Sequence, residues 1–142
     1  MTTSEASSVP FRVLGTGGYA AAAGDEARRV PARVYVASSQ AEASQRWTTL
    51  IGSVAMPSVD FAKESVVFLM LGMRSTGGYA VVPEAVTVKG DGVTVTAQTQ
   101  SPARGDIVTQ AFSAPYAVIA VGRPGIHSAV WVSAGKVVAK TE

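Results

Sequence analysis

The chain has 142 residues, of which 47% are apolar and 15% are charged, and its formal net charge is +2. This length suits one domain with a real core, and the charged fraction lies well below the ~25% of typical globular proteins. These values exclude extended disorder, and they leave part of the surface for a partner to cover. No basic cluster exceeds the pair Arg28-Arg29, so we expect no nucleic-acid partner. The absence of cysteine excludes disulfides, thiolate catalysis and Cys-ligated zinc.

The N-terminal residues 1–10 are small and polar and end in a proline, so we expect a flexible lead-in followed by one domain over residues 11–142. The first residues have neither a basic stretch nor an apolar one, and the chain as given carries no secretory signal. A chain trimmed of its signal would look the same. No apolar run approaches the ~20 residues of a membrane span, so we expect no transmembrane segment.

Two short strands and one helix are predicted in the first third of the chain. Phe11–Leu14 is a strand candidate that ends at a turn over Gly15–Gly18, and Arg33–Ala37 combines β-branched and aromatic residues as strands do. Ser39 and Glu42 have the spacing of a capping box, which predicts that a helix begins there, and Gly52 ends this helix. The helix has one apolar face, formed at helical spacing by Ala43, Trp47, Leu50 and Ile51.

The rest of the chain is rich in strand signals. Ser65–Gly72 is a continuous apolar run, which is typical of a central strand buried on both faces. Tyr79–Lys89 and Val93–Thr99 flank an Asp-Gly turn and should form a hairpin, in which Pro83 marks an edge or a bulge. After a loop over Pro102–Asp106, two more strands are expected at Ile107–Phe112 and Tyr116–Val121, and a final hairpin is expected from Ala129–Ser133 and Lys136–Lys140.

Together these signals predict a β-rich α+β fold, in which one antiparallel sheet of about seven or eight strands carries one amphipathic helix packed on one face.

The pentapeptide Thr-Gly-Gly-Tyr-Ala occurs twice, at Thr16–Ala20 and at Thr76–Ala80. Glycines of this kind cradle phosphate only when a helix follows, whereas a strand-like segment follows the second copy. We therefore interpret the second copy as a structural turn or bulge that presents Tyr79. The first copy has different flanking residues, and we interpret it as a coincidence in an Ala/Gly-rich chain.

Chemistry-bearing residues are few. His127 is the only histidine, so a catalytic triad or a histidine metal site would have to use it, and no partner with motif spacing stands near it. Asp60 lies between Val59 and Phe61, where we expect its carboxylate to fix the turn into the central strand by accepting backbone N–H bonds. We expect no metal site and no cofactor.

From Trp47 onward, a series of short sequence motifs follow one another along the chain. They are the capped helix, Pro57-x-x-Asp60-Phe61, a strand ending Leu71-Gly72, Ser75-Thr76-Gly77-Gly78-Tyr79, Pro102-x-x-Gly105, Val108-Thr109-Gln110-Ala111 and Ala114-Pro115-Tyr116-Ala117-Val118. This order resembles the PrcB C-terminal-type domain, a family named for a protease complex subunit, from about Arg28 to Val121. The resemblance implies a non-catalytic, envelope-associated bacterial lipoprotein that supports a subtilisin-like protease. This chain has no cysteine for lipid attachment, and a cytoplasmic location stays open.

The predicted function is therefore a non-catalytic protein-interaction domain, an accessory or stabilising subunit of a protease or of a self-associating envelope assembly. We expect the contact surface to be formed by Arg74, Thr76, Gly77, Gly78 and Tyr79, with Asp60, Phe61, Pro115 and Tyr116 as neighbours. One alternative is a protease inhibitor that inserts the loop Ser101–Asp106 into a cleft. Another is a ligand-binding or hydrolytic domain that uses His127 and Asp60.

Overall fold

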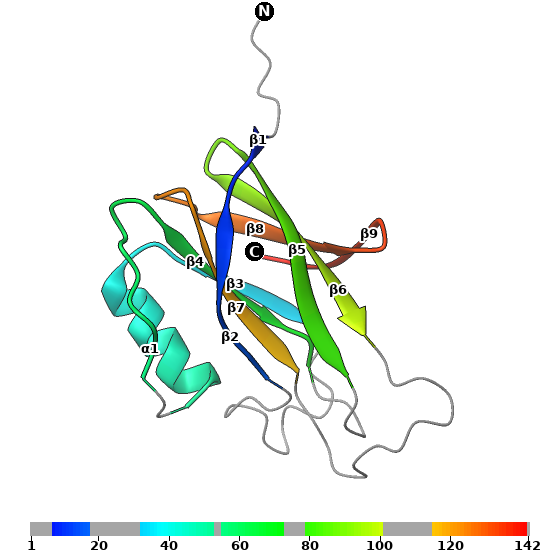
Figure 1. The fold of residues 1–142 in the computed structure, drawn as a ribbon, viewed down its shortest axis with the longest axis horizontal. Helices are drawn as coiled ribbons and strands as arrows, with labels where there is room; N and C mark the ends of the chain where they lie inside the picture. Colours follow the sequence, from blue (N-terminus) through cyan, green and yellow to red (C-terminus); the bar gives the residue numbers. More distant parts are fainter. Residues whose placement is uncertain (1–6, 18–31, 53–54, 73–78, 101–114, 142) are drawn as a thin grey trace, which may run out of the picture.

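Two sheets pack face to face, and one helix covers the outer face of the smaller sheet (Figure 1). The computed structural model describes residues 7–17, 32–52, 55–72, 79–100 and 115–141. The larger sheet has the order β1-β5-β6-β8-β9, with β1 Ser7–Ser8, β5 Ala80–Lys89, β6 Gly92–Gln100, β8 Ser128–Ser133 and β9 Lys136–Lys140. The smaller sheet has the order β2-β7-β4-β3, with β2 Phe11–Gly17, β7 Tyr116–Val121, β4 Ser65–Met70 and β3 Arg33–Ala37.

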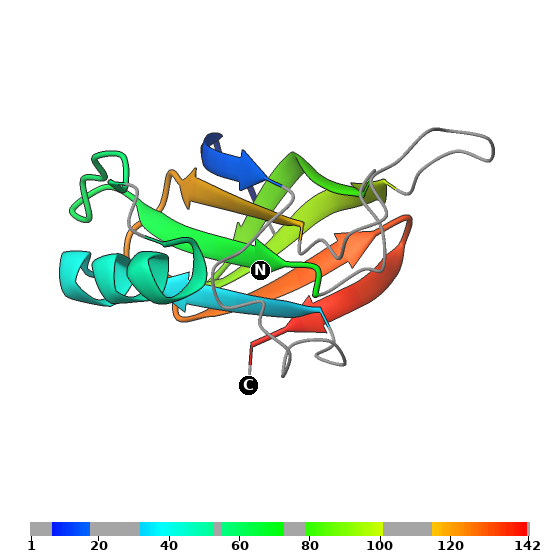
Figure 2. The ribbon, with the colours of Figure 1, turned by 90° about the horizontal axis from the view of Figure 1, so that it is seen from below.

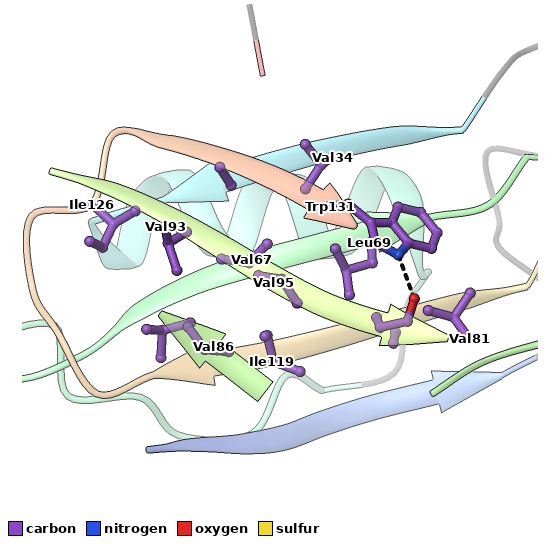
Figure 3. Packing of buried hydrophobic residues seen from close by; sticks show 14 of the residues in the cluster. Val34, Val67, Leu69, Val81, Val86, Val93, Val95, Ile119, Ile126 and Trp131 are labelled. Atoms are coloured by element: carbon purple, nitrogen blue, oxygen red, sulfur yellow. Dashed lines mark hydrogen bonds between the residues drawn. The ribbon is translucent and has the colours of Figure 1, made fainter. Parts of the chain in front are cut away.

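The prediction of a single sheet is therefore wrong, because the strands divide into two sheets. The β-rich character, the one helix and the mostly antiparallel pairing are confirmed. The central strands β4 and β7 carry apolar side chains on both faces. Their Val67, Leu69 and Ile119 face the larger sheet, where they meet the inward valines of β5 and β6 (Figure 3). The helix covers only one face of β4 and β7, so a second sheet is needed to bury the other apolar face. Within that larger sheet, β6 pairs with β8 in parallel, which only a long-range connection allows.

The helix α1, Gln40–Leu50, forms as its sequence predicts. The hydroxyl oxygen of Ser39 accepts a hydrogen bond from the Glu42 N–H at 3.3 Å, and the Glu42 carboxylate accepts one from the Ser38 N–H at 3.0 Å. The helix buries Ala43, Trp47 and Leu50 against β4 and β7, on the side of the small sheet opposite the larger one. Gly52, at φ 127°, follows the last turn.

Two expectations near the N-terminus need correction. Residues 7–10 do not belong to a flexible lead-in, because β1 pairs with Thr87 and Val88 of β5 and the Pro10 carbonyl accepts a bond from the Gly122 N–H at 2.8 Å. The turn expected over Gly15–Gly18 is also absent as far as Gly17, because β2 continues to that residue after a bulge beyond Val13.

The predicted hairpins are confirmed. Gly90 and Asp91 join β5 to β6, and a register shift beyond Pro83 gives the expected bulge. The turn between β8 and β9 has positive φ at Ala134 and Gly135. The predicted strand at 107–112 and the loop at 102–106 lie outside the described residues.

Candidate functional site

Four strand ends of the small sheet line up in register at one end of the molecule. Gly17 and Met70 both pair with Tyr116, and Met70 also pairs with Arg33. Beside this row, β5 of the other sheet begins (Figure 1), and Tyr79 directly precedes it in the chain. The open side between β2 and β5 at this end holds a groove of about 440 Å³, lined by Val13, Thr16, Gly17, Tyr79, Ala80, Val81, Val82, Pro83 and Tyr116.

Close packing explains why glycine stands where β2 meets Tyr116. A Cβ atom on Gly17 would lie 2.9 Å from both Cε1 and the hydroxyl oxygen of Tyr116. Real Cβ atoms essentially never make contacts this short, so a side chain at this position would displace the Tyr116 ring from the end of β2. Tyr116 also packs in part against the cluster beneath α1, which fixes the ring in place.

The groove exposes apolar surface. Three large hydrophobic side chains are exposed among the described residues, and two of them, Val13 at 49% and Val82 at 37%, line this groove. Tyr79 is half-buried, so its ring both packs against the core between the sheets and lines the groove. Apolar side chains and tyrosines that share one hollow are typical of a protein contact.

None of the described residues that line this groove carries a charged side chain. Among the described residues, no group of three His, Cys, Asp or Glu side chains is placed to hold a metal ion. The described part of the groove offers apolar surface and two tyrosine rings, which suits binding a partner.

Asp60 and Phe61 lie at the other end of the small sheet. They precede Ser65, which pairs with Val121, whereas Tyr116 pairs with Met70 at the groove. One carboxylate oxygen of Asp60 accepts the Ala62 N–H at 3.0 Å, so Asp60 fixes the turn into β4 as predicted. These two residues are therefore not among the described residues that line the groove.

An ion pair joins β2 to this turn. Arg12 donates two hydrogen bonds of 3.0 Å to the carboxylate of Glu64 and one of 2.7 Å to the carbonyl of Ser58. The hydrogen bond from Arg12 lowers the pKa of Glu64 below its ordinary value and raises the pKa of Arg12. This pair holds the turn against the strand.

The pairing of His127 with Asp60 is not supported. His127 is exposed, and its backbone N–H donates to the backbone carbonyl of Asp91 at 2.8 Å. The groove beside His127 has no Asp or Glu among the described residues that line it, and the Asp60 carboxylate already bonds to its own turn.

Several predicted contact residues lie outside the described part of the chain. They are Arg74, Thr76, Gly77 and Gly78, and the proposed inhibitory loop 101–106 lies outside it as well. Pro115 is fully buried, and its carbonyl accepts the Leu71 N–H at 3.0 Å, so it ties the start of β7 to the end of β4.

The sequence did not indicate Val13, Thr16, Gly17 or Val82 as groove residues. The available signal was the first copy of the pentapeptide, which we had interpreted as coincidence. The structure places Thr16 and Gly17 of that copy in the same groove as Tyr79 and Ala80 of the second copy.

Comparison with known proteins gives one match. Residues 65–122 match the family model of the PrcB C-terminal domain, which confirms the resemblance over that segment. A search of curated proteins found no significant match, and neither did a search of solved structures. No helix among the described residues has the length and apolar character needed to cross a membrane.

Proposed function

We propose that this chain, which matches the PrcB C-terminal family over residues 65–122, is a non-catalytic protein-interaction domain that serves a protease complex as an accessory or stabilising subunit. The observation that supports this most directly is the groove between β2 and β5, in which Tyr79 and Tyr116 lie beside exposed valines. The matched family supports the choice of a protease complex as the partner.

The groove suits a protein partner for a physical reason. Covering Val13 and Val82 removes apolar surface from water, at about 25 cal/mol per Å². The tyrosine rings add contact area with little loss of side-chain entropy. A catalytic role would require acid, base or nucleophile groups in the groove, and the described residues that line it offer only a threonine and two tyrosines.

Affinity capture with matched variants tests this proposal. The tagged chain, its Val82→Glu variant and its Val137→Glu variant are used to capture proteins from native lysate, and the bound proteins are quantified by mass spectrometry. Val137 is a suitable control because it is 63% exposed on β9 and does not line the groove. A buried carboxylate costs several kcal/mol unless it is paired, so we expect Val82→Glu to reduce recovery of the partner by about tenfold or more.

The same preparations separate an accessory role from inhibition. A captured protease that keeps its activity in the complex supports the accessory role, and one that loses activity contradicts it. The proposal is wrong if Val82→Glu and Tyr79→Ala leave the recovered proteins unchanged relative to Val137→Glu.

A further inference from the structure

The opposite open side of the sandwich carries a second groove with a different chemistry. The strands β3 and β9 are the outermost strands of their sheets, and they lie side by side (Figure 2). The groove there measures about 570 Å³, and its polar lining comes from Arg33, Tyr35, Arg46, His127, Lys140 and Thr141.

Within the described residues, the cations of this groove have no acidic partners. No Asp or Glu is among the described residues that line it, and the ion pair found in that part of the chain joins Arg12 to Glu64 elsewhere. Glu42 lies one helical turn before Arg46, but its carboxylate accepts hydrogen bonds from Ser38. Charges of one sign around a hollow attract ligands of the opposite sign, so the occupant is an anion.

One of these cations is held in a defined orientation. The guanidinium of Arg46 lies over the ring of Tyr35, with its central carbon 4.4 Å from the ring centre. Stacking of this kind fixes the plane of the guanidinium and leaves its N–H edge for a carboxylate or a phosphate. The stack thereby ties the helix α1 to the edge of β3.

The shape of the groove favours an extended peptide over a phosphate or a nucleic acid. The donors come from four separate elements, β3, α1, β9 and the segment before β8, rather than converging on one helix end or loop. β3 pairs with β4 and, within the described ranges, with no second strand, so its outer backbone groups can pair with an added strand. Bases of a single-stranded nucleic acid would need open aromatic faces, and Arg46 covers a face of Tyr35, the one Phe, Tyr or Trp ring among the described lining residues.

We infer that this second groove binds an extended, acidic segment of a protein, which adds to the edge of β3 and places carboxylates against Arg33, Arg46 and Lys140. This site goes beyond the proposed function, because none of its described lining residues also lines the groove between β2 and β5. The two sites can therefore be tested with separate variants.

Fluorescence anisotropy with the full chain tests the inference. The probe is a labelled ten-residue peptide in which glutamate alternates with threonine, and the matched probe carries glutamine in place of each glutamate. We expect the acidic peptide to bind with a dissociation constant below about 100 μM and the glutamine peptide to bind at least about tenfold more weakly.

Charge-matched variants locate the site on the protein. Arg33→Gln/Lys140→Gln removes two cations of the groove, and Lys63→Gln/Lys136→Gln removes two exposed cations that do not line it. The first variant should weaken binding of the acidic peptide by about tenfold, and the second by less than about twofold. Thermal unfolding of both variants checks that the fold is kept.

Three results would overturn the inference. One is the absence of binding up to about 1 mM peptide, a weak limit for any specific site. Another is equal weakening by the two charge-matched variants, which would reduce the effect to net charge. The third is tighter binding of a ten-nucleotide single-stranded DNA or of inorganic phosphate, used as competitors.

Discussion

Replacing Ser65 by alanine should destabilise the fold more than any other single loss of a hydroxyl group among the described residues. Ser65 is fully buried at the start of β4. Its hydroxyl donates to the Arg123 carbonyl at 2.8 Å and accepts the Ile126 N–H at 3.2 Å. These two bonds hold the segment after β7 in the position from which the Ile126 side chain, itself fully buried, fills the end of the core (Figure 3).

The magnitude follows from what the substitution leaves unpaired. The Ile126 N–H is buried, and a buried group without its partner costs about 1–3 kcal/mol. The Arg123 residue is exposed, so its carbonyl can turn to water at little cost. We therefore expect Ser65→Ala to lower the free energy of unfolding by about 2 kcal/mol, which corresponds to a fall of roughly 4–8 °C in melting temperature for a chain of this length.

Urea unfolding followed by tryptophan fluorescence measures the effect. Ser133→Ala is the matched control, because Ser133 is also a buried strand serine but its hydroxyl bonds are long, at 3.4 and 3.5 Å. We expect the control to lose less than about 1 kcal/mol. A loss for Ser65→Ala no larger than that for Ser133→Ala would refute the argument that this hydroxyl anchors the end of the core.

Three further substitutions test other contacts. Glu64→Gln removes a carboxylate whose folded pKa lies below its ordinary value of 4.5. The charged carboxylate stabilises the fold above that value, and this stabilisation is lost as the pH falls through the folded pKa. The variant should therefore have a free energy of unfolding about 1 kcal/mol lower at pH 7, and acid unfolding titrations should show this difference shrinking. Gly122→Ala would place a Cβ 2.9 Å from Cγ of Pro10, which should cost about 1–3 kcal/mol in urea unfolding, and adding Pro10→Ala should recover part of that loss. Gly17→Ala must displace the Tyr116 ring, so affinity capture should recover less partner, whereas unchanged recovery would separate the ring from the contact.

Local signals in the sequence predicted most of the elements. The Asp-Gly turn between alternating runs located the hairpin of β5 and β6, because that turn matches the twist of paired strands. The capping box and the spacing of Ala43, Trp47 and Leu50 located α1 and its buried face. These features depend on residues close in the chain, which is why the sequence reveals them.

The division into two sheets depends on contacts between distant residues. Alternation in β6 shows which face of Val93 and Val95 is buried, but it does not show which strand lies beside them. The parallel neighbour, β8, begins only at Ser128. The burial of β4 on both faces was predicted. In a parallel sheet helices cover both faces, whereas here the helix covers one face of β4 and the larger sheet covers the other.

Glycine signals were ambiguous for a similar reason. Gly15 and Gly17 looked like turn residues, but both lie in an extended strand. A Cβ on Gly15 would lie 3.2 Å from Cη2 of Trp47, and one on Gly17 would meet the Tyr116 ring. Each glycine is needed because a bulky ring from another element lies against the backbone, and the sequence does not reveal which ring that is.

The two grooves lie on opposite open sides of one sandwich, and this placement shapes what the protein can do. One side, between β2 and β5, brings together Thr16 and Gly17 of the first pentapeptide copy and Tyr79 and Ala80 of the second, and its described lining residues carry no charge. The other, between β3 and β9, collects Arg33, Arg46 and Lys140, which are far apart in the chain. Sites without shared residues usually contribute independently, so Val82→Glu should leave acidic-peptide binding unchanged, and Arg33→Gln/Lys140→Gln should leave capture of the partner unchanged. Loss of both activities in either variant would instead indicate one continuous contact that wraps the sandwich.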